Sequence, residues 1–213
     1  MKWIILIGLL TPFTVHATCN VDMSMLNLNY DAVMTDTDVS NHGETDLFIL
    51  VYSNSPRFCK YAESQGFADK IKFQCESEND FGWVLHGLWA ENKQMFIEKK
   101  KDGHPRWCKG DLEMESIETL VPYICMSPGT ALLQGEWEKH GACDFESAEQ
   151  YFSMAKKLHD ELNLPPKETD TSQAIKWMVD NNQLITIDNI VNMNHEFAIC
   201  YSKSFNLMNC PVE

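Results

Sequence analysis

The order of apolar and polar residues predicts three strands in this chain. Residues 46–52 (Asp-Leu-Phe-Ile-Leu-Val-Tyr) form a short apolar run of the length of a buried strand, and the turn-forming residues 53–56 follow it. Residues 81–85 predict a second strand and residues 196–201 a third. Because strands and helices mix here without regular strand–helix–strand units, we predict an α+β fold with a central antiparallel sheet packed by several helices.

Helical spacing dominates the second half of the chain. Apolar residues recur every three or four positions over 147–162, ahead of two consecutive prolines. The pattern predicts helices over 130–140, 147–162, 171–179 and, more briefly, 185–193. Gly141 is predicted to stop the first of them. Residues 20–44 are polar and poorly periodic, which predicts an irregular arm.

The first residues have the pattern of an export signal. Lys2 precedes an apolar run over 3–15, and Val15-His16-Ala17 fits a cleavage site of the small-x-small type. The run is shorter than a bilayer requires, although an uncleaved anchoring helix is the alternative. We expect residues 1–17 to be a signal peptide and residues 18–213 to form a single domain that has no membrane attachment once the signal is removed.

All eight cysteines follow this segment. An even number behind an export signal predicts a disulfide-stapled protein in an oxidising compartment, either secreted or periplasmic. The spacing alone leaves the pairing open. The cysteines are Cys19, Cys59, Cys75, Cys108, Cys125, Cys143, Cys200 and Cys210.

The charge balance limits how the protein binds a polyanion. The chain has 31 acidic and 17 basic residues, for a formal net charge of −14. Overall charge therefore opposes the binding of nucleic acid. An RNA substrate would have to be held by a local positive site and by base stacking.

Two histidine-containing segments carry candidate chemistry. Glu136, Lys139 and His140 share one face of a predicted helix, since they are spaced i, i+3 and i+4. His86 ends the predicted strand 81–85 and is followed by Gly87, which permits a sharp turn. Each segment alone also fits a structural histidine, with a simple Glu–Lys pair in the first. Together they supply two imidazoles that titrate near neutral pH, as acid–base cleavage of RNA requires.

These segments resemble those of a known family. His86-Gly87-Leu88-Trp89 and the run 136–143 (Glu-Trp-Glu-Lys-His-Gly-Ala-Cys) are similar to the two active-site segments of the ribonuclease T2 family, and the likeness extends over nearly all of 45–211. The resemblance implies a secreted, acid-active endoribonuclease that cleaves single-stranded RNA. Cleavage would proceed through attack by the 2′-hydroxyl to a 2′,3′-cyclic phosphate and then a 3′-phosphate. It implies no metal and no cofactor, and we expect a monomer.

The resemblance also implies residue roles. His140 would be the general base and His86 the general acid, while Glu136 and Lys139 would stabilise the pentacoordinate phosphorus. Trp89 would pack against a base or the backbone at the cleavage site. The implied disulfides are Cys59–Cys75, Cys108–Cys143 and Cys200–Cys210, which leaves Cys19 and Cys125 for a fourth.

The sequence departs from the family pattern at several positions. Gly135 replaces a histidine that assists phosphate binding in many members, Ala90 replaces a proline and Ala142 a threonine. Tyr52 and Pro122 occupy positions where the family holds the downstream base, and Tyr52 replaces the glutamine of plant members. Base preference is therefore open.

The only basic cluster and two rival functions complete the set of hypotheses. The cluster (Lys99, Lys100, Lys101, His104 and Arg106) either contacts RNA phosphates or forms a solvated loop.

One rival function is that of an RNA-binding or interaction protein on the same fold whose catalysis has lapsed. The other is a metallohydrolase with Glu136, His140 and His86 as ligands. Lys139 would repel a cation there, and no HExxH pattern exists.

Overall fold

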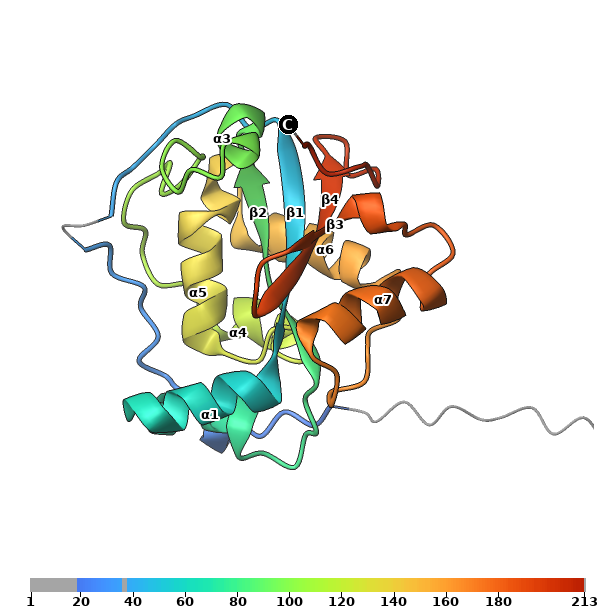
Figure 1. Ribbon diagram of the computed structural model, residues 1–213. Helices are drawn as coiled ribbons and strands as arrows, with labels where there is room; N and C mark the ends of the chain where they lie inside the picture. The colour runs from blue at the N-terminus through green and yellow to red at the C-terminus, as the bar shows by residue number, and fades with distance from the viewer. Residues whose placement is uncertain (1–18, 36–37, 213) are drawn as a thin grey trace, which may run out of the picture.

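The protein is built on one four-stranded antiparallel sheet. The computed structural model describes residues 19–35 and 38–212, so the predicted signal peptide over 1–17 lies outside the described residues. The strand order is β2-β1-β4-β3, with β1 and β4 in the centre (Figure 1). The strands are β1 (Leu47–Asn54), β2 (Trp83–Glu91), β3 (Ile190–Asn192) and β4 (Glu196–Ser202). The predicted α+β class is confirmed.

Seven α-helices of the described residues surround the sheet. The helices predicted over 130–140, 147–162 and 171–179 are confirmed, with small changes in their bounds. The α-helices are α1 (Ser55–Gln65), α2 (Lys72–Cys75), α3 (Lys93–Ile97), α4 (Ile117–Leu120), α5 (Thr130–Lys139), α6 (Ala148–Asp160) and α7 (Thr171–Asn181). Short 3₁₀ helices are η1 (Met23–Met25), η2 (Ala68–Ile71), η3 (Val121–Tyr123), η4 (Gly141–Cys143) and η5 (Ile187–Asn189). None of the described helices has the length and apolarity to span a membrane.

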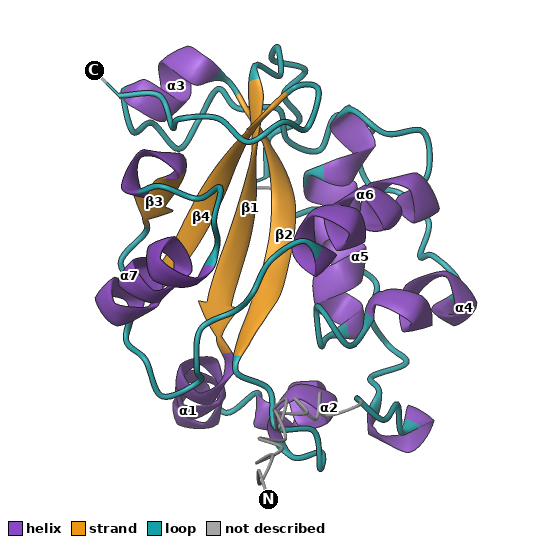
Figure 2. Ribbon diagram, turned by 90° about the vertical axis from the view of Figure 1, so that its right-hand side faces the viewer, coloured by secondary structure: helices purple, strands orange, loops and turns teal. Residues whose placement is uncertain are grey.

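The two faces of the sheet differ in what covers them. Phe48, Leu50 and Tyr52 of β1 point into the main core, which α5, α6 and α7 complete. The alternate residues Leu47 and Ile49 point to the other face, where a smaller apolar cluster lies. Helix α5 runs beside β2 at one edge of the sheet, and α7 lies beside β3 and β4 (Figures 1 and 2). The edge next to α5 is where the candidate site forms.

Two predicted elements are wrong. Residues 53–56 do not form a turn, because β1 continues to Asn54 and α1 begins directly after it. The side chain of Asn54 accepts a hydrogen bond from the Arg57 amide at 3.1 Å, so it caps the helix. Residues 185–193 do not form the predicted helix either: only the 3₁₀ turn η5 is helical there, and the β-branched Ile190 and Val191 pair with β4 as an edge strand.

Four disulfides staple the described residues. The structure has the three pairs that the resemblance implies and a fourth, Cys19–Cys125. The fourth ties the start of the N-terminal arm to the segment ahead of α5. The arm is irregular apart from η1, as predicted.

Candidate active site

His86 lies at a β-bulge inside β2, and not at the end of a strand. Gly87 pairs with Val51 and Leu85 pairs with Tyr52, so His86 has no partner on β1. A bulge of this kind inserts one extra residue and redirects its side chain. The strand prediction of 81–85 was therefore too short, because β2 continues past the bulge to Glu91.

The bulge explains how the core and the site share one strand. Leu85 and Leu88 both pack in the main core, although strict alternation would place residues three apart on opposite faces. The extra residue restores the core register for Leu88. It leaves His86 on the same side of the sheet as Trp89, which packs against the smaller apolar cluster.

Position 87 requires glycine because another side chain packs closely against it. The sequence analysis instead expected a sharp turn there. A Cβ atom at this position would lie 1.8 Å from Oε2 of Glu136. Only a residue without a side chain lets the Glu136 carboxylate approach β2 this closely.

Helix α5 presents the second half of the site at the edge of the sheet. Leu133 and Trp137 point into the main core, as the helical spacing predicts for Trp137. Glu136 and His140 are buried against β2, whereas Lys139 is exposed. The helix ends at Lys139, and the chain continues into η4, which the Cys108–Cys143 disulfide anchors.

Trp89 contacts three ionisable side chains: His86 on the same strand, and Glu136 and His140 from the end of α5. The indole Nε1 donates a hydrogen bond to Oε2 of Glu136 at 2.7 Å. The His140 ring stacks on the indole at 4.9 Å with 7° between the planes, and the His86 ring meets it edge-on at 5.2 Å. Nε2 of His86 lies 3.4 Å from Oε1 of Glu136. The structure therefore brings both histidines to a single indole.

A further carboxylate, which the sequence analysis missed, joins this cluster. Oε1 of Glu196, the first residue of β4, lies 2.6 Å from Nδ1 of His86. No spacing rule connects residues 110 positions apart.

The surroundings of His140 favour its neutral form. Burial lowers the pKa of His140 well below its ordinary value, and the positive charges of Arg106 and Lys139 add to the effect. Its Nδ1 is buried without a hydrogen-bond partner among the described residues. An imidazolium needs acceptors for both ring N–H groups, so this environment disfavours protonation.

The carboxylates around His86 favour its charged form. Burial by itself would lower the pKa of His86, but the charge of Glu136 and the hydrogen bond and charge of Glu196 raise it above the ordinary value. The pKa of Glu136 is raised by burial, which the His86 charge and the Trp89 hydrogen bond oppose. The pKa values of the two histidines therefore shift in opposite directions within one site.

A shallow pocket of about 290 Å³ lies beside these groups. Glu136 and Lys139 line it, together with Trp107 and residues 32–33 of the N-terminal arm. Gly135 also lines it, and a Cβ there would meet only the Ala32 Cβ, at 3.7 Å. The missing side chain at position 135 thus leaves open space next to α5.

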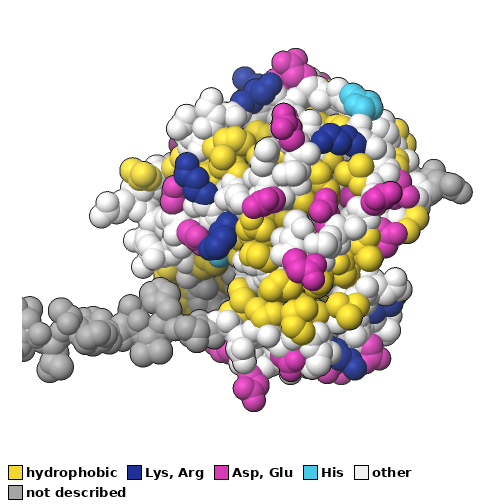
Figure 3. All heavy atoms as spheres, turned by 180° about the vertical axis from the view of Figure 1, so that it is seen from behind, with side chains coloured by type: hydrophobic (Ala, Val, Ile, Leu, Met, Phe, Trp, Pro, Cys, Tyr) yellow, Lys and Arg dark blue, Asp and Glu magenta, His cyan; other side chains and the backbone are white. Residues whose placement is uncertain are grey.

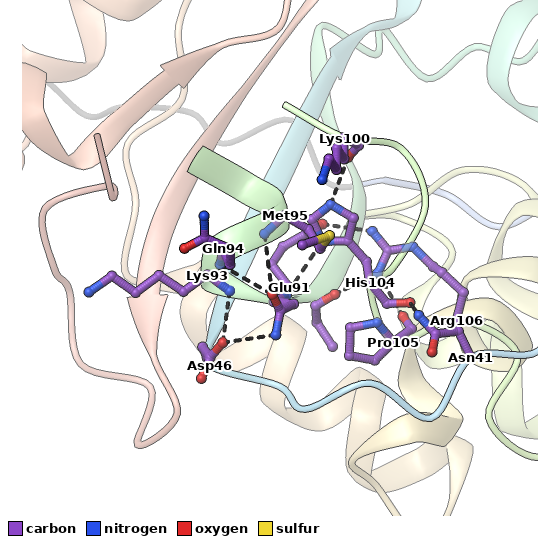
Figure 4. A network of polar contacts seen from close by, with 12 residues as sticks. Asn41, Asp46, Glu91, Lys93, Gln94, Met95, Lys100, His104, Pro105 and Arg106 are labelled. Carbon is purple, nitrogen blue, oxygen red and sulfur yellow. Dashed lines mark hydrogen bonds and ion pairs between the residues drawn. The ribbon is translucent and has the colours of Figure 1, made fainter. Parts of the chain in front are cut away.

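The predicted basic cluster does not form one surface. Lys99, Lys100 and Lys101 are exposed, whereas His104 is buried and paired with Glu91. A guanidinium nitrogen of Arg106 donates to Glu91 Oε1 at 2.8 Å, within the network of Figure 4. Arg106 is therefore a structural cation behind the site. The view from behind the molecule likewise shows acidic side chains scattered among separate Lys and Arg side chains, with no continuous basic patch on that face (Figure 3).

The position of Tyr52 contradicts its expected role in base binding. Its side chain is fully buried in the core, stacks on Phe197 and hydrogen-bonds Nδ1 of His159 at 3.1 Å. A nucleobase cannot reach it. Pro122 is exposed in η3 and lines a hollow of about 630 Å³ beside α6, so its role in base binding stays a prediction.

Comparison with known proteins agrees with the geometry. The model of the Ribonuclease T2 family matches residues 45–193, well over half of the chain. The chain belongs to the ribonuclease T2 family. It is 36% identical over 189 residues to a probable ribonuclease of Haemophilus influenzae, covering 85% of this chain and 68% of that protein. It is 27% identical over 132 residues to a ribonuclease of Aeromonas hydrophila, covering 62% and 53%.

Solved ribonuclease T2 relatives share the fold. An RNase-related protein from Calystegia sepium superposes with a TM-score of 0.54 at 18% identity, over 80% of this chain and 92% of that one. A mutant of RNase MC1 in complex with 5′-UMP superposes with a TM-score of 0.50 at 15% identity, over 79% and 94%. Family membership identifies the chain as a ribonuclease. Within residues 19–35 and 38–212, no group of three or more His, Cys, Asp or Glu side chains is arranged to hold a metal ion.

Proposed function

We propose that this ribonuclease is a metal-independent endoribonuclease that cleaves single-stranded RNA through the 2′-hydroxyl of the substrate. The observation that carries the proposal is the pair of imidazoles on Trp89, with the pKa of His140 lowered and that of His86 raised. A neutral histidine is a base and a protonated one is an acid, so both partners of the reaction are present in the same pH range.

The first step breaks the RNA chain. His140 takes the proton of the 2′-hydroxyl, whose oxygen attacks the adjacent phosphorus. His86 donates its Nε2 proton to the departing 5′-oxygen as the P–O5′ bond breaks, and a 2′,3′-cyclic phosphate remains. Lys139 offsets the negative charge that gathers on the phosphorane, and Glu136 stabilises the charged His86.

The second step opens the cyclic phosphate. The two histidines exchange roles, as microscopic reversibility requires. His86, now neutral, takes a proton from water, whose oxygen attacks the phosphorus, and His140 returns its proton to the 2′-oxygen as the P–O2′ bond breaks. The product is a 3′-phosphate.

The substrate class is supported by a relative and by the site itself. RNase MC1 was solved with 5′-UMP, which is consistent with nucleotide binding on this fold. Lys139 offers a local positive charge, and Trp89 is partly exposed for contact with a base or the backbone. We therefore propose that the protein binds single-stranded RNA as a monomer and without a cofactor.

The disulfides support a location for the protein. Four disulfides fit an oxidising compartment. We propose that residues 1–17 direct export and are removed, and that the domain of residues 18–213 acts outside the cell or in the periplasm.

One assay tests the reaction. Purified protein is incubated at about pH 5 with single-stranded RNA in excess EDTA, beside the same oligomer with a deoxyribose at the cut position. We expect loss of the RNA and survival of the deoxy oligomer, because only the first carries the nucleophile. His86→Ala and His140→Ala should each reduce kcat by about 10²–10⁴-fold while the protein stays folded.

Other outcomes would contradict the proposal. RNA binding without cleavage would indicate a lapsed enzyme, and activity that EDTA removes and zinc restores would indicate a metallohydrolase. Normal activity of either histidine variant would remove that residue from the mechanism.

A further inference from the structure

Glu196 is the one carboxylate from β4 that contacts a group of the proposed reaction. We infer that Glu196 is a positioning residue that orients His86 and keeps it protonated for its role as general acid. The inference rests on the proposed function, since it concerns how that acid is prepared.

The strand order explains how side chains of two non-adjacent strands, β2 and β4, come into contact. β1 lies between β2 and β4, and neighbouring strands are about 4.8 Å apart, so the side chains must span about 10 Å. Ser53 of β1 lies opposite Glu196, and its side chain is small, so it fills little of the space between β2 and β4. The bulge turns His86 toward this space.

Glu196 has no other hydrogen-bonding or ion-pair contact of its side chain among the described residues. Its Oε1 accepts from Nδ1–H of His86 at 2.6 Å, a short distance typical of a charge-assisted bond. The Glu196 side chain is 24% exposed and that of His86 is 30% exposed, so the pair lies at the rim of the site. The pair is therefore within reach of solvent.

Fixing Nδ1 decides which nitrogen acts on the substrate. With Nδ1–H held by Glu196, only Nε2 is directed at the α5 side of the site, where it lies 3.4 Å from Glu136. The Nε2 proton is then the one given to the 5′-oxygen, and the Nδ1 proton stays in place. The hydrogen bond thus sets the tautomer of the neutral His86 that remains after the transfer.

The charges around His86 set the pH at which it loses its proton. The charged and titratable groups that act on it are the carboxylates of Glu136 and Glu196, which raise its pKa, and Lys139, which lowers it; His140 also lies on Trp89. Removing the Glu196 charge should lower the pKa of His86. Since the general acid must be protonated, the loss of activity with rising pH should then begin at a lower pH than in the wild type.

The test compares Glu196→Gln with Glu196→Ala. Glutamine keeps an acceptor for Nδ1–H but removes the charge, whereas alanine removes both. Glu63→Gln, at an exposed position on α1, is the control for an equal change in net charge. The measurements are the pH profile of kcat/KM on an RNA oligomer and the pKa of His86 by NMR of the free protein, assigned with the His86→Ala spectrum.

For Glu196→Gln we expect the basic limb of the profile and the NMR pKa to move down together by about one pH unit, with near-normal activity on the acidic side. Glu196→Ala should also lose about 10-fold or more in kcat on the acidic side, because the ring is no longer oriented. Glu63→Gln should match the wild type.

Two results separate the inference from the proposed function. Normal RNA cleavage with an unchanged basic limb and an unchanged NMR pKa in Glu196→Gln would overturn the role of Glu196 alone. If the wild type fails to cleave RNA while the NMR pKa still falls in Glu196→Gln, the ion pair is real, but the proposed function is overturned and the catalytic role of Glu196 with it.

Discussion

At the scale of single residues, the contact between Gly87 and Glu136 gives a sharp prediction. Gly87→Ala would place a Cβ 1.8 Å from Oε2 of Glu136, so the carboxylate must move away from Trp89 and His86. We expect kcat to fall by about 10²-fold or more, since the charge arrangement around the phosphate is lost. Steady-state kinetics on an RNA oligomer measure this loss, and circular dichroism checks that the variant is folded.

Gly135→Ala is the matched control. Position 135 adjoins Glu136 in the same helix, but its new Cβ would meet only Ala32, at an ordinary contact distance of 3.7 Å. Activity should stay close to that of the wild type, and the free energy of unfolding should rise by about 0.5–1 kcal/mol, because glycine is unfavourable inside a helix. Equal activity losses in both variants would contradict the special role of Gly87.

Local sequence patterns predict some residues of the site and miss others. The spacing predicts Glu136, Lys139 and His140 on one helix face, and the structure has Glu136 and Lys139 on α5 with His140 as the cap residue at its end. The Glu196–His86 pair depends on the order of strands in the sheet, which no local pattern contains. Tyr52 was misassigned because position in a motif says nothing about burial, and alternation along β1 turns its side chain into the core.

At the scale of elements, the Cys108–Cys143 disulfide couples the loop ahead of α4 to η4, which directly follows α5. Cys143 follows His140 by three residues, and the adjacent Trp107 amide donates to the Lys139 carbonyl at 3.0 Å. Replacing both cysteines by alanine should lower the free energy of unfolding by about 4 kcal/mol, given the 35-residue separation. It should also lower kcat, because Lys139 and His140 lose their support.

The Cys59–Cys75 pair provides the comparison. It joins α1 to α2 across 16 residues, and its removal should cost about 3 kcal/mol. Here kcat at a temperature where the protein is folded should be unchanged. Denaturant unfolding and kinetics of the two double variants measure both effects. A similar loss of kcat in both would show that activity follows global stability, and not the local anchor.

Elements were predictable where their cause is local. Helices α5, α6 and α7 follow from apolar spacing over three or four turns. β3 was mistaken for a helix because a three-residue edge strand is too short to show alternation, and it exists only through pairing with β4. The bulge in β2 was missed for a similar reason: it is a mismatch between two strands, and appears only when β1 is laid beside β2.

At the scale of the whole molecule, the net charge of −14 conflicts with a polyanionic substrate. The exposed cation at the proposed site is Lys139, whereas Arg106 is paired with Glu91 and the charge of His86 is balanced by two carboxylates. Binding of single-stranded RNA loses affinity with salt with a log–log slope of about −0.7 for each phosphate neutralised. One or two such contacts give a slope of about −1, which the acidic surface makes shallower still.

We therefore expect kcat/KM on an RNA oligomer to depend weakly on salt between about 20 and 500 mM NaCl, with a log–log slope no steeper than about −1. The triple variant Lys99→Gln, Lys100→Gln, Lys101→Gln should leave the slope unchanged, because these exposed lysines belong to a loop outside the catalytic cluster. Lys139→Gln should flatten the slope and lower kcat. A slope of about −3 or steeper that becomes shallow in the triple variant would show that the lysine loop binds the RNA backbone. Recognition would then extend well beyond the indole and its two imidazoles.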